Sequence, residues 1–540
     1  MKHGLKISLI LVLGIFILYP AVRTLMVSFQ TDHGVSFANY EYLFKTPGSL
    51  VAIKNTLVMG ILTVLICGAI GTFLAFFVHF FDVPFNRLLD KILMLPLVVP
   101  GLIIVFSFVQ LYGESGLVTK TLESLFNLEA PPYSFVGLSG ILLVHAYTQY
   151  IYFYMNVTVA IKQLDRSVIE ASMNLGASPW KVFTTIIIPF IKPALISSSI
   201  LTFMTGIGSF SAPNIIGGGY KVLTTQILLA KANMYLELAA SQVVVLSLFA
   251  LSYLGVARIY ERRAAFASSV RESELQPVKI KNKAAKTLMV TLASALIAMI
   301  VLPILTIVFL SFVKPGTWMI EIYPKEFSID NYINIFTKPR SLAPFVNSIK
   351  MALLASLSAA AVSIPASYIL TKTTSKTRPL IEFMVMLPFA MPASAIAINM
   401  INGFSQILLG TWLLLPLAYF VNLLPMAVRS ISLSYQRLKG EYAEASKTLG
   451  AGNSTTFLKI TLPLIAPGIW AGLLLVFIRS IGEYTISAFL YTASNRPISI
   501  AMVNSIFEFN IGLAMAYGSL VLALTFLGSA LIRKLQHSTE

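Results

Sequence analysis

The sequence predicts an all-α membrane protein with about twelve transmembrane helices, arranged as two parallel six-helix repeats. Hydrophobic residues make up 57% of the 540 residues and charged residues only 11%, whereas soluble domains carry about 25% charged residues. The mean hydropathy is +0.81. In addition, a short polar segment occurs twice, beginning at Glu170 and again 274 residues later at Glu444. A protein that presents the same polar segment twice is expected to engage two copies of one soluble partner.

Apolar runs long enough to cross a bilayer occur in both halves of the chain. The first six fall at about 7–28, 55–80, 91–112, 138–160, 193–215 and 239–260. The second six fall at about 287–312, 347–371, 381–404, 410–430, 467–491 and 513–533. The first run follows a basic start but lacks a clear small-residue cleavage site, so we interpret it as a retained span and not as a signal peptide.

The net charge of +17 does not indicate a nucleic-acid partner, because the lysines and arginines lie mainly in short loops between apolar runs. The loops 161–192, 258–286 and 429–459 are strongly basic. By the positive-inside rule these loops and both termini are cytoplasmic, although the basic loop 313–346 departs from the pattern. The single cysteine, Cys67, lies in an apolar run, which excludes a disulfide framework and a cysteine-based metal site.

The repeat extends beyond the polar segment and defines two modules. The matched positions before it are Asn55-Thr56 with Asn347-Ser348, and Leu95-Pro96 and Pro100 with Leu387-Pro388 and Pro392, all 292 residues apart. The later offset of 274 means that the first half holds 18 additional residues, which we place in the external loop 113–137. We therefore expect a first module at 1–260, a cytoplasmic linker at 261–286 and a second module at 287–540. Since six spans separate the copies, the two modules share one orientation.

The repeated polar segments lie in the loops 161–192 and 431–466. Their shared residues are Glu170, Ala171, Gly176 and Ala177 in the first loop, Glu444, Ala445, Gly450 and Ala451 in the second, and the prolines Pro189, Pro193, Pro463 and Pro467 that follow. In the first loop, Ser167 and Glu170 predict a capping box, and Gly176 predicts a left-handed helix end. Ser178-Pro179 predicts the start of another helix. Such a short helix, joined to two spans, either transmits a partner's movement to the membrane or only stabilises the loop as an interfacial helix.

These loops resemble the cytoplasmic coupling loop of ABC importer permeases. The shared pattern is Glu-Ala, a glycine six residues after the glutamate, and then Ile-x-x-Pro; it is most complete from Glu444 to Pro463. The first copy departs from it by having Ile188 before Pro189 where leucine is usual. Over nearly its whole length the chain is similar to the fused, two-module permeases of the ferric-iron, thiamine, polyamine and phosphonate importer group. This resemblance implies the type I, MetI-like permease fold.

The resemblance also implies the partners. Each coupling loop would dock on one of two copies of a cytoplasmic ABC ATPase, and a periplasmic binding protein would deliver the substrate. The chain itself contains no Walker A signature and no Gly-Lys dipeptide, so ATP and Mg²⁺ are expected on the separate ATPase. We thus expect a multi-pass subunit of the bacterial inner membrane with no catalytic residue, no metal site and no cofactor of its own.

A second pair of matched segments follows the coupling loops and is our candidate for the translocation path. Its positions are Ser209 and Phe210 in the first half and Glu483 and Tyr484 in the second. A carboxylate within a span costs about 2.5–3.5 kcal/mol on insertion scales, so it usually faces a polar cavity. Alternatively, Arg479 lies four residues before Glu483 and would pair with it on one helix face.

The sequence does not identify the substrate. Ferric iron is the first expectation, from resemblance only, with thiamine, 2-aminoethylphosphonate and polyamines as alternatives. A different class of protein, a twelve-span secondary transporter driven by an ion gradient, is also built from two six-span halves. That alternative leaves the repeated coupling loops unexplained.

Overall fold

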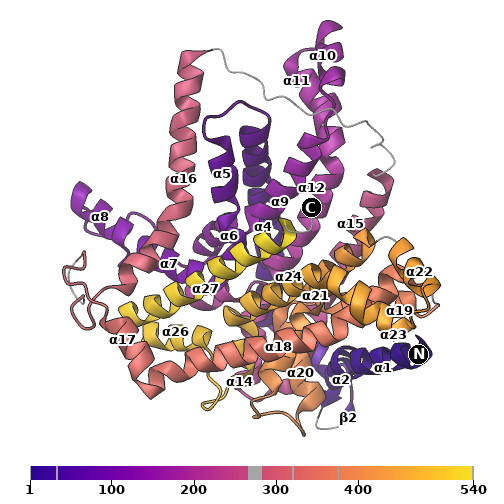
Figure 1. Cartoon of the computed structure of the whole chain (residues 1–540). Coiled ribbons are helices and arrows are strands. Elements are labelled where there is room, and N and C mark those ends of the chain that lie inside the picture. The colour runs from indigo at the N-terminus through magenta and orange to yellow at the C-terminus, as the bar shows by residue number, and fades with distance from the viewer. Residues whose placement is uncertain are drawn as a thin grey trace. The chain divides into compact units, whose positions relative to one another are not determined.

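The computed structural model describes residues 2–31, 34–264, 282–318, 322–374, 376–438 and 440–537. These residues are almost entirely helical, which confirms the all-α prediction (Figure 1). The one sheet among these residues is a hairpin in which β1 (Gln30–Thr31) pairs antiparallel with β2 (Gly34–Val35). Most of the linker predicted at 261–286 lies outside the described residues.

Among the described residues, ten helices are long and apolar enough to cross a membrane, or eleven if the bent pair Arg378–Ala390 and Ala393–Phe404 counts as one span. The predicted fourth span forms α9 (Leu138–Lys162) but is not among them. Its polar residues include His145 and Gln149, both buried. A central helix surrounded by protein tolerates such residues because other helices hydrogen-bond them.

The chain forms two compact units that differ from the two modules predicted in the sequence. Unit 1 comprises Met1–Glu41, Ile227–Val244 and Leu310–Glu540, and unit 2 comprises Tyr42–Gln226 and Val245–Phe309. Each half therefore contributes its first span to the unit built mainly from the other half. No local feature of the sequence predicts this exchange, because the apolar composition of a span does not specify which half of the chain it packs against.

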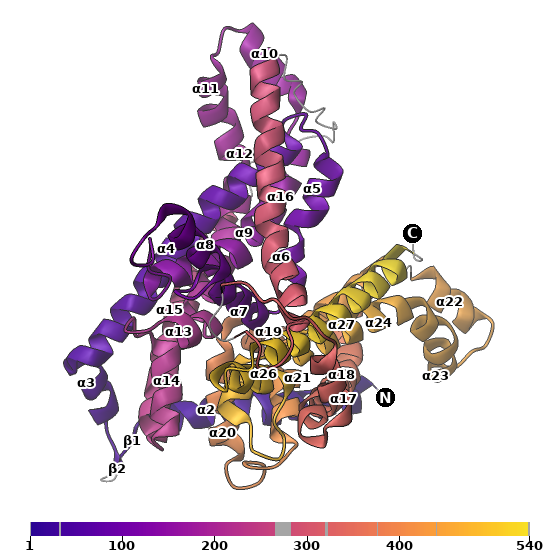
Figure 2. The ribbon, with the colours of Figure 1, turned by 90° about the vertical axis from the view of Figure 1, so that its left-hand side faces the viewer.

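The contacts of the exchanged spans are specific. The N-terminal span consists of α1 (Lys2–Leu13), a π-helical turn η1 (Gly14–Leu18) and α2 (Tyr19–Val27). Asn402 of α20 (Ala393–Phe404) donates a hydrogen bond to the Thr24 hydroxyl at 3.2 Å. In unit 2, the Tyr147 hydroxyl of α9 donates to the Ile300 carbonyl of α16 (Lys283–Ser311) at 2.6 Å, and Figure 2 shows α16 beside α9.

The core of unit 2 is formed by α4, α9 and α12. The helices of the first half that complete or flank it are α3 (Ala38–Lys45), α4 (Pro47–His79), α5 (Asn86–Leu93), α6 (Leu95–Val98), α7 (Gly101–Tyr112), α8 (Leu117–Phe126), α10 (Arg166–Asn174), α11 (Pro179–Val182), η2 (Phe183–Ile187), α12 (Ile188–Ile207), α13 (Ser211–Ile216), α14 (Leu223–Ala232) and α15 (Leu236–Ala264). Gly71 allows α4 and α9 to approach closely, because a Cβ there would lie 2.4 Å from the Tyr150 carbonyl oxygen.

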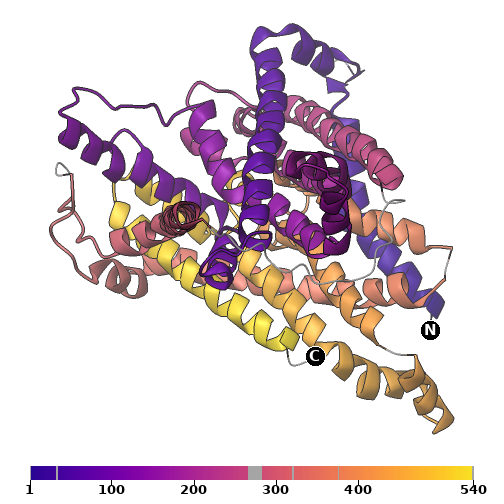
Figure 3. The same cartoon turned by 90° about the horizontal axis from the view of Figure 1, so that it is seen from above.

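The core of unit 1 is formed by α18, α21 and α24, and Figure 3 shows the C-terminal helix α27 lying alongside α24. The helices of the second half are α17 (Asp330–Thr337), α18 (Pro339–Lys372), α19 (Arg378–Met386), η4 (Leu387–Ala390), α20, α21 (Leu414–Arg437), α22 (Glu441–Thr448), α23 (Asn453–Thr456), η5 (Phe457–Thr461), α24 (Leu462–Ile481), α25 (Thr485–Leu490), α26 (Ile498–Phe507) and α27 (Ile511–His537). The set α18, α21 and α24 corresponds to α4, α9 and α12 in sequence order.

The third span of each half is broken where the sequence predicted a continuous helix. Val99 and Met391, each directly before a proline, have extended backbones with ψ of 130° and 134°. A residue before proline is disfavoured in the helical region by the proline ring. In the second half the two segments meet at a bend of 115°.

Candidate functional site

The first candidate coupling loop contains α10, which begins two residues earlier than the predicted capping box. The Asp165 carboxylate accepts a hydrogen bond from the Ser167 backbone N–H at 2.8 Å. Asp165 is thus the cap, and Ser167, which the sequence predicted in that role, lies inside the helix. The helix start predicted at Ser178-Pro179 is confirmed, since the Ser178 hydroxyl accepts from the Lys181 N–H.

The two loop helices end in the same way. Gly176 and Gly450 have φ angles of +83° and +82°, in the left-handed region that glycine adopts without steric cost. Ala177 N–H donates to the Ser172 carbonyl, and Ala451 N–H donates to the Ser446 carbonyl. These bonds form a Schellman motif in each copy. The left-handed end predicted at Gly176 is therefore confirmed, and Gly450 repeats it.

An exposed leucine precedes each of these glycines, and sequence analysis did not single it out. Leu175 is 89% exposed and Leu449 is 87% exposed. The glutamates Glu170 and Glu444 and the alanines Ala171 and Ala445 are exposed as well. Large side chains that are this open and occur in pairs mark an interaction surface more often than isolated exposed apolar residues do. The two leucines occupy the same position in the repeat, and this shared Leu-Gly pair is the sequence feature that would have identified them.

The first coupling loop is fixed to its span by a small hydrophobic cluster. Leu164, Ile169, Val182 and Ile187 are buried together at the junction of the loop helices with α12. Ile169 belongs to α10 and lies beside Glu170, so a force on α10 reaches Val182 and Ile187 directly. The short helix is thus packed against the base of the span that it precedes.

A π-helical turn joins each loop to its span, and the two turns occupy equivalent positions. They are η2 (Phe183–Ile187) and η5 (Phe457–Thr461), again 274 residues apart. Pro189 and Pro463 follow each turn by two residues. A proline ring clashes with the carbonyl four residues earlier in a regular helix, and the wider turn relieves that clash. Single π turns in helices are frequent at functional sites.

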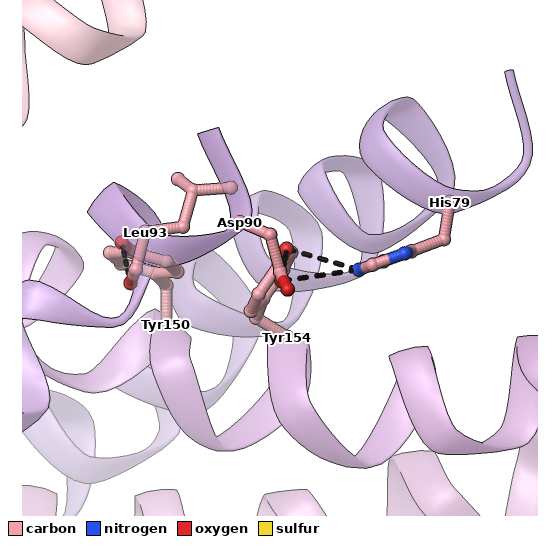
Figure 4. Close-up of polar contacts among 5 residues, drawn as sticks. All are labelled: His79, Asp90, Leu93, Tyr150 and Tyr154. Carbon is pink, nitrogen blue, oxygen red and sulfur yellow. Dashed lines mark hydrogen bonds and ion pairs between the residues drawn. The ribbon is translucent and has the colours of Figure 1, made fainter. Parts of the chain in front are cut away.

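A polar cluster ties the short helix α5 to two spans at the same end of α9 as the first coupling loop. Figure 4 shows the Asp90 carboxylate between His79 and Tyr154. The Tyr154 hydroxyl donates to Asp90 Oδ1 at 2.6 Å, and His79 Nε2 lies 3.3 Å from the same oxygen. The hydrogen bond from His79 is the largest of the effects that lower the pKa of Asp90 below its ordinary value. Nearby, the Tyr150 hydroxyl donates to the Leu93 carbonyl at 2.6 Å.

The predicted path residue Ser209 lies in a buried network in unit 2. His145 Nε2 lies 2.8 Å from the Ser209 hydroxyl, and its Nδ1 lies 2.8 Å from the Thr63 hydroxyl. His145 therefore links α4, α9 and the end of α12. Phe210, next to Ser209, is buried. This arrangement is that of polar contacts joining helices within a membrane protein.

The equivalent residue in unit 1, Glu483, caps a helix. Its carboxylate accepts hydrogen bonds from the backbone N–H groups of Ile486 and Ser487, at 3.0 and 3.1 Å. These are orphan donors at the start of α25, where a carboxylate is favoured by the helix dipole. Tyr484 beside it is buried. The ends of α12 and α24 are thus organised by different chemistry, a histidine–serine contact in one and a capping carboxylate in the other.

The broken third spans carry buried polar residues that sequence analysis missed. Ser107 and Gln110 lie in α7, and Asn399 and Asn402 lie 292 residues later in α20, all buried. Two matched polar positions within an apolar run were the signal that would have found them. Broken helices with polar side chains often lie near substrate sites in transporters.

Comparison with known proteins identifies the family of these repeats. The family model described as "Binding-protein-dependent transport system inner membrane component" matches twice, at residues 67–266 and 363–540. The chain is 26% identical over 500 residues to the "Probable ABC transporter permease protein y4fN" of Sinorhizobium fredii, covering 91% of this chain and 88% of that protein. It is 24% identical over 537 residues to the "Ferric transport system permease protein FbpB" of Actinobacillus pleuropneumoniae, covering 96% and 76%.

A shorter relative matches one part of the chain. The "Sulfate transport system permease protein CysT" of Salmonella typhimurium is 29% identical over 220 residues, covering 37% of this chain and 79% of that protein. This match spans most of the shorter relative but little more than a third of this chain. The two longer relatives instead match both halves.

Proposed function

Because the chain belongs to the family of binding-protein-dependent transport system inner membrane components, we propose that it is a two-module permease of an ATP-driven importer. The observation that carries the proposal is the pair of coupling loops, which repeat the same left-handed glycine, Schellman motif and exposed leucine. Two equal surfaces on one chain suit two copies of one ATPase. In this proposal the ATPase copies hold ATP and Mg²⁺, and a periplasmic binding protein supplies the substrate.

The proposed coupling step follows the packing of the first loop. An ATPase dimer that closes on ATP moves α10 and α22 together. The cluster at Leu164, Ile169, Val182 and Ile187 passes the movement of α10 to α12, and the π turn is the point at which the span can bend. Both coupling loops and both termini are then cytoplasmic, in agreement with the basic loops.

Ferric iron is the proposed substrate, with thiamine, 2-aminoethylphosphonate and polyamines as the alternatives. It is supported by the ferric transport permease of Actinobacillus pleuropneumoniae, whose similarity extends over 96% of this chain. Iron would pass through the protein as cargo, delivered by the binding protein. Identification of the ligand that co-purifies with the binding protein tests this part of the proposal.

The exposed leucines provide the test of ATPase docking. We expect Leu175→Glu with Leu449→Glu to abolish ATPase co-purification and to reduce ATP-dependent uptake more than tenfold, because each change places a charge in an apolar contact. Leu125→Glu, at an exposed leucine near the end of α8, is the matched control and should leave both unchanged. Full retention of ATPase binding and uptake by the double variant would contradict the proposal.

Uptake measured in proteoliposomes distinguishes the proposed importer from a secondary transporter. Uptake should require ATP and the ATPase subunit and should not respond to a proton or sodium gradient alone. Uptake driven by a gradient without ATP would favour the secondary transporter, whose two halves would have the same parallel arrangement.

A further inference from the structure

A large apolar groove opens on the membrane-spanning part of unit 2, outside the sites described above. Its volume is about 730 Å³, and it lies between α4 and the α12 span, with Phe153 of α9 contributing to the wall. Ligand sites in proteins commonly measure about 300–1,000 Å³. Leu65 and Phe73 at its edge are 62% and 55% exposed. The groove is therefore both large enough for a ligand and open to the surroundings of the span.

The wall of the groove is built from a continuous run of aromatic rings. Phe76 contacts Phe80 and Phe183, with ring centroids 5.8 Å apart in each pair. Phe183 is the first residue of the π turn η2 and stacks on Trp180 at 5.7 Å. The polar side chains in the wall are few, so a hydrophilic solute such as the proposed cargo does not fit this groove.

The mouth of the groove has the features of a membrane–water boundary. Trp180 is 71% exposed, and tryptophan is enriched at the level of lipid headgroups. Lys192 is exposed and lies three and four residues before Leu195 and Ile196, which line the groove. Residues at these spacings share one helix face. A lysine on this helix face is long enough to bring its ammonium group to the headgroups while its carbon chain stays beside apolar residues.

In the second half, larger side chains stand at the positions equivalent to two residues of the groove wall. Thr72 and Ser199 of the groove correspond to Ile364 and Leu473. Ile364 and Leu473 pack against the buried cluster of Ile431, Tyr435, Ile465 and Ile469. At the mouth, Trp180 and Lys192 correspond to Ser454 and Ala466. The space, the aromatic boundary and the positive charge therefore occur together in the first half.

We propose that this groove binds an anionic phospholipid, with an acyl chain along the phenylalanine wall and the phosphate at Lys192. Basic positions between membrane helices on the cytoplasmic side are suited to anionic headgroups, and the apolar wall supplies the hydrophobic contribution. Because Phe183 belongs to the π turn, the bound lipid touches the junction between the first coupling loop and its span. The assignment to the cytoplasmic leaflet rests on the proposed orientation of the importer, whereas the binding site itself does not.

Photolabelling tests the groove. The full chain is placed in phosphatidylcholine nanodiscs that contain phosphatidylglycerol with a photoactivatable acyl chain, and the labelled peptides are mapped. We expect the label on the groove segments of α4, η2 and α12. Thr72→Ile with Ser199→Leu, which introduces the second half's residues, should reduce this labelling at least fivefold. Thr72→Val with Ser199→Ala preserves the space and should retain it. Equal labelling of the filled variant, or labelling spread evenly over both halves, would overturn the proposal.

A second experiment tests whether the headgroup of the bound lipid is anionic. Lys192→Gln should lower the preference for the phosphatidylglycerol probe over a matched phosphatidylcholine probe about fivefold, the effect of one lysine near an anionic surface. Lys459→Gln, an exposed lysine in the second coupling loop, is the control and should leave the preference unchanged. Equal labelling by the two probes in the unaltered protein would overturn the anionic assignment. Labelling needs no ATPase, so a failure of the proposed importer function would leave these results intact.

Discussion

The two halves of the chain agree most closely in their coupling loops and differ most in the spans behind them. The loops share their glycine ends, their exposed leucines and their π turns. Behind them, Ser209 is bonded to a histidine whereas Glu483 caps a helix. The aromatic groove lies in the first half, and the second half has the larger Ile364 and Leu473 at two of its positions. A repeated sequence thus keeps its geometry in the loops that are proposed to make two equal contacts, and departs from it where each half packs in its own surroundings.

The largest expected effect comes from the glycine ends, the feature that the two halves share. Gly176→Val with Gly450→Val should reduce uptake more than tenfold, because a left-handed backbone costs a residue with a side chain roughly 1–2 kcal/mol and a β-branched one more. Gly452→Ala is the matched control, since Gly452 has a φ of −68° and open space around it. ATP-dependent uptake and ATPase binding measure the outcome. Wild-type uptake by the double variant would show that the shared left-handed ends of the loops are not required for transport.

A smaller effect is expected at Asp90, which is hydrogen-bonded to Tyr154 and lies close to His79. Asp90→Asn should lower the free energy of unfolding by about 2 kcal/mol, the scale for hydrogen bonds to a charged group. Its counterpart in the second half, Glu382, is exposed, so Glu382→Gln should change stability by less than about 0.5 kcal/mol. Thermal unfolding in detergent compares the two. Equal losses would remove this difference between the halves.

The contribution of Asp90 to stability should depend on pH. The folded-state pKa of Asp90 is lowered, so its stabilisation is fully present above the unfolded-state pKa of about 4 and is lost as the pH falls through the folded-state value. The stability difference between the unaltered protein and Asp90→Asn should therefore persist at neutral pH and shrink below about pH 4. A difference that grew on acidification would contradict the assignment.

Glu483 and Ser209 test whether the ends of α12 and α24 differ in function or only in packing. Glu483→Gln should lower the free energy of unfolding by about 1 kcal/mol, within the range for loss of a helix cap. Ser209→Ala should cost a similar or smaller amount, the net value of one buried hydrogen bond. If Glu483 also lines the path, uptake by Glu483→Gln falls further than its stability explains. Normal uptake would leave Glu483 with the capping role alone.

The smallest effect concerns the starts of the two loop helices. The helix α10 has a side-chain cap in Asp165, whereas α22 follows Gly440 and has none. Asp165→Ala should therefore cost about 0.5–1 kcal/mol, and Gly440→Ala, with a φ of −60° and open space, should cost nothing measurable. Calorimetry of both variants would show whether the loops differ in rigidity despite their common shape.

Much of the fold follows from the sequence because apolar length and repeat spacing are local signals. The positions of the long spans and the helix end at Gly176 belong to this part. The cap at Asp165 was missed because two neighbouring residues were both good caps, and only the backbone geometry decided between them. The breaks at Pro100 and Pro392 were visible as prolines, but their angles depend on the packing of neighbouring helices.

The candidate site was predicted less completely than the fold. The candidate coupling residues were singled out because they repeat, whereas the leucines before their glycines repeat as well but were not included among them. The capping contacts of Glu483 were not predicted, because a carboxylate near a helix start and a carboxylate in a polar path look alike in a sequence. The exchange of first spans was not predicted, since it joins residues as distant as Thr24 and Asn402.

That last contact has a consequence for how the protein is made. Thr24 and Asn402 are separated by 378 positions, so at a synthesis rate of 5–20 residues per second the first span waits roughly 20–75 s for the helix on which it packs. During that interval it lacks the helix that carries Asn402. If the halves were synthesised as separate polypeptides, each compact unit would need a span from the other polypeptide, and assembly would then depend on their meeting in the membrane.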